Sequence, residues 1–185
     1  MSFEAQVEAI VLTPEQEAEL KAAAVGRAPE ELAAVDAAES DEMLFYALPS
    51  AAMAAFHLER YDHAKELAER ALILAPCYER NWNFGNAVHF AHTALGLVAL
   101  HNDDLANAVR ELGEAGATPG SPQLDSFGPT MQLAKALLRR GESEAVLAYL
   151  NQCRSFWKMG DAWLDLWEQK IQSGGVPNFF MHCYR

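Results

Sequence analysis

Cysteine is scarce in this chain and is never closely paired. The three cysteines, Cys77, Cys153 and Cys183, are an odd number and lie far apart, without a Cys-x-x-Cys spacing. Disulfide frameworks need a dense, even set of cysteines, and four-thiolate zinc sites need closely spaced ones. The sequence therefore predicts neither a disulfide scaffold nor a zinc site of that kind.

Long apolar runs are also missing. No stretch approaches the ~18 apolar residues that predict a membrane-spanning helix. The first residues, from Met1 to Ala5, lack the basic start and the apolar stretch of a secretory signal. We therefore expect a cytoplasmic location.

Positive charge is in short supply. Lys and Arg number 14 against 26 Asp and Glu, which gives a formal net charge of −12. A field of this sign repels nucleic-acid phosphates and anionic lipid headgroups. We expect no nucleic acid and no membrane as a partner, whereas a neutral or basic protein partner agrees with the charge.

Motifs of common reactions are absent as well. The sequence has no Gly-x-Ser-x-Gly elbow, no GxxxxGK[ST] phosphate loop, no GxGxxG and no His-Glu-x-x-His. These motifs bring a nucleophile, a phosphate-binding backbone or a metal together with a base. Without them, we predict no catalytic residue and no cofactor.

The composition that remains is that of a helical protein. Hydrophobic residues make up 51% of the chain and charged residues 22%, with Ala, Leu and Glu prominent. A chain of 185 residues can bury a sizeable core in a single domain. We therefore expect one compact all-α domain.

Capping signals outline the beginning of the chain. The run from Thr13 to Gln16 has the residues of a capping box with proline at the first helical position. It predicts a helix that ends at Gly26, and Pro29 then starts another short helix. Residues 1–42 are expected to form an N-terminal arm and leading helices.

Small residues recur in pairs over the middle of the chain, twelve or eleven positions apart. The pairs are Ala52 with Ala64, Gly96 with Ala108, and Ala134 with Ala145. Small residues at this distance let two antiparallel helices touch closely, so the pattern predicts three helical hairpins. The run from Gly113 to Pro129 is rich in Pro and Gly, and we expect a loop rather than a helix there.

The spacing resembles that of the tetratricopeptide repeat (TPR) family, in which units of about 34 residues carry small residues and a proline at set places. The first hairpin matches best, through Ala52, Ala64 and Pro76. The resemblance implies a TPR-like α-solenoid of about three helical hairpins over residues 43–157. Residues 158–185 would then form a C-terminal capping helix and a tail.

The same resemblance implies a concave groove lined by the first helix of each hairpin. Such a groove, rich in aromatics and methionine, suits an extended peptide or an amphipathic helix, so we predict a protein- or peptide-binding adaptor or scaffold. An alternative is that the leading helices or the C-terminal tail fill the groove. The predicted lining residues are Tyr46, Met53, Phe56, Asn86, His89, Phe90, Thr93, Leu97, Met131 and Lys135.

Asn86, His89 and His92 suggest a different class of function. On a helix the two histidines are three positions apart and lie close together. They could hold a metal if a third ligand joined them, as in a small-molecule- or metal-dependent enzyme with a helical pocket. Histidines on an otherwise apolar helix are more often hydrogen-bonded core residues, so the main prediction includes no metal.

The last residues, from Phe179 to Arg185, are largely apolar. Their side chains must either pack on the body of the protein or meet another chain. Homo-oligomer formation through this tail is therefore a further alternative.

Overall fold

The described part of the chain is entirely helical. The structure, a computed structural model, describes residues 1–179 and 182–184, and these form ten α-helices, two short 3-10 helices and no strand. The predicted all-α class is confirmed. The helices are α1 (Phe3–Glu8), α2 (Pro14–Asp36), α3 (Asp41–His57), α4 (Tyr61–Leu74), η1 (Ala75–Tyr78), α5 (Phe84–His101), α6 (Leu105–Gly116), α7 (Pro122–Phe127), α8 (Gln132–Leu138), α9 (Ser143–Cys153), η2 (Lys158–Gly160) and α10 (Asp161–Gln172).

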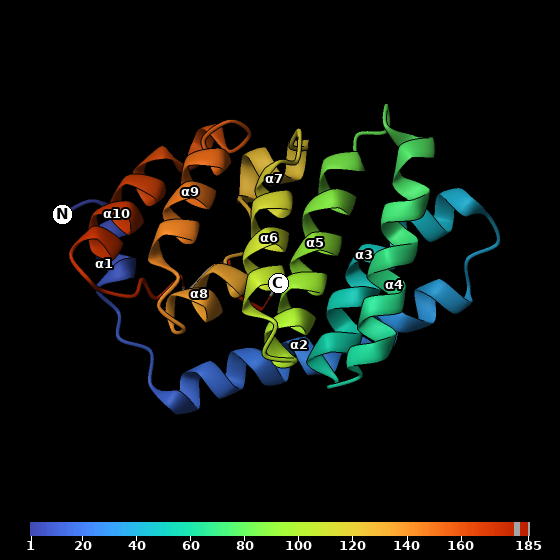
Figure 1. Cartoon of the computed structure of the whole chain (residues 1–185), viewed down its shortest axis with the longest axis horizontal. Coiled ribbons are helices and arrows are strands. Elements are labelled where there is room, and N and C mark those ends of the chain that lie inside the picture. Colours follow the sequence, from blue (N-terminus) through green and yellow to red (C-terminus); the bar gives the residue numbers. More distant parts are fainter. Residues whose placement is uncertain (180–181, 185) are drawn as a thin grey trace.

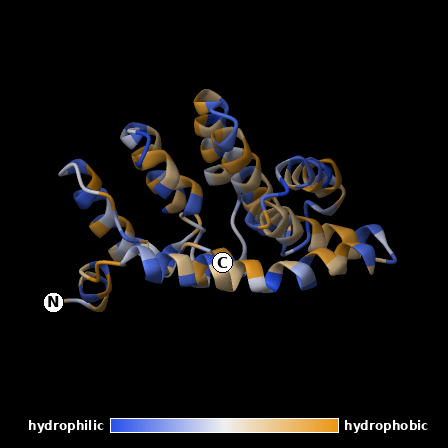
Figure 2. Cartoon of the chain, turned by 90° about the horizontal axis from the view of Figure 1, so that it is seen from below, coloured by the Kyte–Doolittle hydropathy of each residue, from blue (hydrophilic) through white to orange (hydrophobic). Residues whose placement is uncertain are grey.

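Most of the helices stand in a row, and one long helix crosses them. Figure 1 shows α4, α5, α6, α9 and α10 in succession from one end of the molecule to the other. Helix α3 packs against both α4 and α5, and α6 packs against α5 and α9. Figure 2 shows α2 as a single rod along one side of this row. Among the described residues, no helix combines the length and the apolarity needed to cross a bilayer.

Helix α2 is longer than the sequence predicted. It continues from Pro14 to Asp36, so the expected end at Gly26 and the expected new start at Pro29 are both wrong. In a helix interior a glycine costs about 1 kcal/mol and a proline about 3 kcal/mol relative to alanine. Ala24 and Ala28 of this helix are buried, and α2 packs along α3. This tertiary packing offsets the poor helix propensity.

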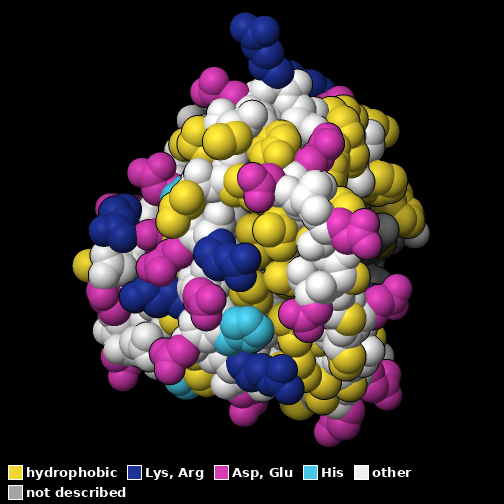
Figure 3. Space-filling view, turned by 90° about the vertical axis from the view of Figure 1, so that its right-hand side faces the viewer, with side chains coloured by type: hydrophobic (Ala, Val, Ile, Leu, Met, Phe, Trp, Pro, Cys, Tyr) yellow, Lys and Arg dark blue, Asp and Glu magenta, His cyan; other side chains and the backbone are white. Residues whose placement is uncertain are grey.

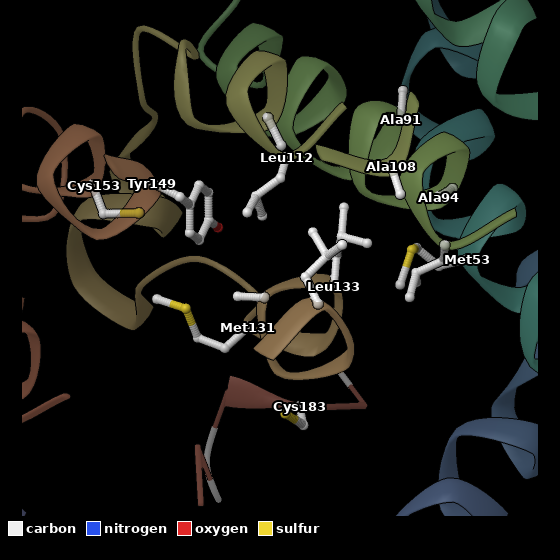
Figure 4. Packing of buried hydrophobic residues seen from close by; sticks show 14 of the residues in the cluster. Met53, Ala91, Ala94, Ala108, Leu112, Met131, Leu133, Tyr149, Cys153 and Cys183 are labelled. Carbon is white, nitrogen blue, oxygen red and sulfur yellow. The ribbon is translucent and has the colours of Figure 1, made fainter. Parts of the chain in front are cut away.

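The small residues of the repeat pattern lie in the core, except Ala145, which is only partly buried. Ala52, Ala64, Ala108 and Ala134 are all fully buried. A Cβ atom at Gly96 would lie 2.3 Å from Leu133 Cδ2, so this glycine makes room for a leucine. Figure 4 shows Leu133 between Ala108 and Leu112 of α6 and Met53 of α3. The core therefore joins α8 to the two preceding hairpins.

The segment between α6 and α8 contains a helix that the sequence did not predict. The expected loop from Gly113 to Pro129 is wrong at its start, because α6 continues to Gly116, and again at α7. The Ser121 hydroxyl accepts the backbone N–H of Leu124 and caps α7. Pro122 follows at the first helical position, where the N–H that proline lacks would have no partner within the helix.

The described C-terminal residues pack on the body of the protein. Trp167 of α10 is fully buried, and its ring lies 4.9 Å from that of Phe179 and 5.1 Å from that of His182. Of the two alternatives for the tail, these residues follow the first. Phe180, Met181 and Arg185, which also belong to the predicted tail, lie outside the described residues.

The N-terminal helix is fastened to the same end of the molecule. Glu8 is only 6% exposed, and its carboxylate accepts three hydrogen bonds. The donors are Lys170 Nζ at 2.6 Å, the Asn178 N–H at 2.8 Å and Trp167 Nε1 at 3.2 Å. A buried carboxylate with three donors is well compensated for its loss of water.

Candidate binding surface

His89 of α5 links two segments of backbone. Its Nδ1 lies 3.1 Å from the Ala115 carbonyl, and its Nε2 lies 3.1 Å from the Thr130 nitrogen. A carbonyl can only accept and an N–H can only donate, so Nδ1 carries the proton and Nε2 accepts. Burial lowers the pKa of His89 to about 4. Both nitrogens of this neutral ring are therefore used to hold the structure.

Asn86 lies one helical turn before His89 and is equally engaged. Its amide group donates to Asn83 Oδ1 at 2.7 Å and to Gln123 Oε1 at 2.5 Å. Its Oδ1 accepts from the Ser121 hydroxyl at 2.6 Å. These bonds fasten α7 and the residues before it to α5.

His92 bonds to a residue of α6 and not to the neighbours of His89 or Asn86. Its Nδ1 lies 2.7 Å from Glu111 Oε2, and the other oxygen of Glu111 accepts from Arg110 at 2.8 Å. Burial by itself raises the pKa of Glu111, but the bonds from His92 and Arg110 lower it overall. Asn86, His89 and His92 thus bond to three different neighbours rather than around one centre. Nowhere in residues 1–179 and 182–184 do three side chains of metal-binding type form a group.

Most of the predicted groove residues are buried. Tyr46 is 36% exposed, and Phe56 and Phe90 are partly buried. The other seven are at most 7% exposed: Met53, Asn86, His89, Thr93, Leu97, Met131 and Lys135. Most of the side chains that were predicted to line a groove therefore face the interior of the protein.

Helix α2 and the C-terminal segment cover this face. Lys135 Nζ donates to Glu17 of α2 and, at 3.1 Å, to the Asn178 carbonyl. The Arg27 guanidinium of α2 donates to the Tyr184 carbonyl at 2.9 Å. Helix α2 and residue 178 therefore lie against Lys135, one of the predicted lining residues.

An opening remains between α2 and α3, and we call it the α2–α3 pocket. Its volume is about 590 Å³. Small side chains at Ala34, Ala47 and Ser50 leave this space where the two helices face each other. The pocket is lined by Arg27, Glu30, Glu31 and Ala34 from α2 and by Met43, Tyr46, Ala47 and Ser50 from α3.

Large apolar side chains reach solvent at and beside this pocket. Met43 is 47% exposed and Trp82 is 51% exposed. Tyr46 lines the pocket, and its ring lies 5.8 Å from the Trp82 ring. Its hydroxyl lies 3.1 Å from Asn81 Oδ1. Figure 3 shows that hydrophobic side chains gather in a band on this end of the molecule, with acidic side chains around them.

Of the pocket residues, the sequence prediction named Tyr46 alone. A signal was present, because both helices place their lining residues at positions i, i+3, i+4 and i+7, which form one helical face. On α3 these are Met43, Tyr46, Ala47 and Ser50, and on α2 they are Arg27, Glu30, Glu31 and Ala34. The break expected between Gly26 and Pro29 concealed the α2 half of this pattern.

The buried histidines lead to a prediction about acid stability. In the unfolded chain His89 takes up a proton below pH 6.5, whereas in the folded protein it stays neutral down to about pH 4. Stability is therefore complete above 6.5 and decreases as the pH falls from 6.5 towards 4, by up to about 3 kcal/mol for this residue. Burial, aided by Lys21 and Arg27, also lowers the pKa of His57 to about 4, with the same sign.

Urea unfolding at about pH 7 and at about pH 4.5 measures this loss. His57→Leu is the informative variant, because His57 Nε2 has no hydrogen-bond partner within the described residues. The leucine removes one titrating group and one unpaired polar atom. We expect a smaller loss of stability on acidification than in the wild type, and an equal loss would contradict the role given to His57.

Comparisons of the chain with models of protein families, with curated proteins and with solved structures found no match.

Proposed function

We propose that this is a TPR-like helical repeat protein that binds a segment of a partner protein in the α2–α3 pocket. In this proposal α3–α4, α5–α6 and α8–α9 are the three hairpins. Their support is the set of fully buried alanines at Ala52, Ala64, Ala108 and Ala134. A cytoplasmic location, expected from the sequence, belongs to the same proposal.

The observation that carries the proposal is the α2–α3 pocket with its exposed apolar residues. Seven of the ten predicted lining residues are buried, so the proposal places the partner at another surface. A volume of about 590 Å³ is within the range of ligand pockets. Methionine and aromatic side chains, as at Met43, Tyr46 and Trp82, are enriched at surfaces that bind proteins.

A peptide selection with pocket variants tests the proposal. Random dodecapeptides displayed on phage are selected on the full-length protein, and the affinities of the enriched peptides are measured by isothermal titration calorimetry. Burial of one large apolar side chain contributes about 1.5–3 kcal/mol. We therefore expect the double variant Met43→Ala/Tyr46→Ala to weaken binding by about tenfold or more.

Ile73→Ala is the matched control. Ile73 is apolar and 77% exposed, but it lies on α4 outside the pocket, and its loss should leave the affinity unchanged. Circular dichroism of each variant verifies that the fold is retained. Equal affinities of the wild type and the pocket variant for every enriched peptide would contradict the proposed function.

A further inference from the structure

The charges around the α2–α3 pocket point to the chemistry of its ligand. Two acidic residues, Glu30 and Glu31, belong to its lining. Asp41 and Glu42, both exposed, directly precede the lining residue Met43 in the first turn of α3. The apolar part of the pocket is thus bordered by carboxylates from both helices.

Of these residues, Glu31 gives the strongest indication of the ligand's charge. It is partly buried, and it forms no ion pair and no hydrogen bond with any residue that the structure describes. Burial raises its pKa, and the nearby charge of Arg27 lowers it only in part. A partly dehydrated carboxylate without a direct ion-pair partner is costly, and a cation brought by a ligand would relieve this cost.

The cation in the pocket lining, Arg27, offsets the charge of Glu31 only in part and forms no ion pair with it. Arg27 uses its guanidinium on the Tyr184 carbonyl, at 2.9 Å, and so points to the C-terminal segment. The chain as a whole has a net charge of −12 and would repel an acidic ligand. Both the local and the overall charge therefore favour a basic ligand.

We propose that the α2–α3 pocket binds a basic segment of a partner protein, whose apolar side chain enters between Ala34 and Met43 while a neighbouring Lys or Arg pairs with Glu31 or Glu30. This inference rests on the proposed function, because it concerns the same pocket. It adds the class of ligand. An apolar anchor fills the space between the helices, and the adjacent cation both pairs with the carboxylates and speeds association.

The peptides selected above provide the first test. We expect them to carry Lys or Arg next to a Leu, Phe, Trp or Met. We also expect Glu30→Gln/Glu31→Gln to weaken their binding about tenfold, since the basic side chain loses both carboxylates with which it can pair. Added sodium chloride should weaken binding to the wild type more than binding to this variant.

Glu19→Gln/Glu66→Gln is the matched control. Both residues are exposed and lie outside the pocket. Their substitution changes the net charge by the same amount as Glu30→Gln/Glu31→Gln. Their substitution should leave the affinity nearly unchanged. An equal loss in this control would assign the effect to overall charge and would overturn the inference.

The two proposals fail in different ways. Peptides that depend on Met43 and Tyr46 but lack basic residues, or that bind Glu30→Gln/Glu31→Gln as tightly as the wild type, would overturn the basic-ligand inference alone. If no peptide depends on Met43 and Tyr46, the proposed function and the inference fall together.

Discussion

Gly85→Ala is expected to destabilise the protein by about 3 kcal/mol or more. A Cβ atom at this position would lie 1.8 Å from the Gly120 carbonyl oxygen and 2.4 Å from its carbon. The obstacle is backbone, which cannot rotate away as a side chain can. The Thr118 hydroxyl also donates to the Gly85 carbonyl at 2.8 Å, so the methyl group would push apart two segments that are bonded together.

The control is Gly26→Ala, which we expect to raise the stability of the protein. Nothing lies within 4 Å of a Cβ atom placed there, and the residue is in the interior of α2. Alanine should therefore stabilise the helix by about 0.5–1 kcal/mol. Urea unfolding of both variants measures the difference. Wild-type stability in Gly85→Ala would show that α5 and the residues around Gly120 do not touch in solution.

Trp167→Ala is the second substitution with a large expected effect, a loss of about 3–5 kcal/mol. Trp167 is fully buried, and its removal would leave a cavity and deprive Glu8 of a donor. The surrounding rings would lose a common neighbour: Trp157, Trp163, Phe179 and His182 all lie within 5.8 Å, centroid to centroid.

Trp82→Ala removes the same side chain from a site that is 51% exposed. Its cost should be far smaller, within about 1 kcal/mol. Thermal unfolding of the two variants makes the comparison, with calorimetry to verify a single transition. Similar midpoints for both would contradict the central place given to Trp167 in the core.

Local signals account for the parts of the fold that the sequence predicted. The predicted Thr13 capping box begins α2. Alanines at helical spacing correctly indicated which faces are buried, as at Ala52 and Ala64. Each of these features depends on residues a few positions apart, which a sequence displays directly.

The errors arose where distant contacts override local preference. Gly26 and Pro29 predict a break in α2, yet packing against α3 holds the helix together. The cover over Lys135 depends on its pairing with Glu17, 118 positions away. No periodicity encodes such a pair. The α2–α3 pocket, a space left by small residues on two helices, likewise requires the relative placement of those helices.

The carboxylate of Glu8 has a consequence for synthesis of the chain. This carboxylate accepts a hydrogen bond from Asn178, 170 positions later, so the first helix meets these neighbours only after the ribosome has made that later segment. At typical translation rates this interval is about 10 to 30 s. Early helices can pair during that time, but α1 stays undocked and its apolar side chains stay exposed until its partner segment has been made.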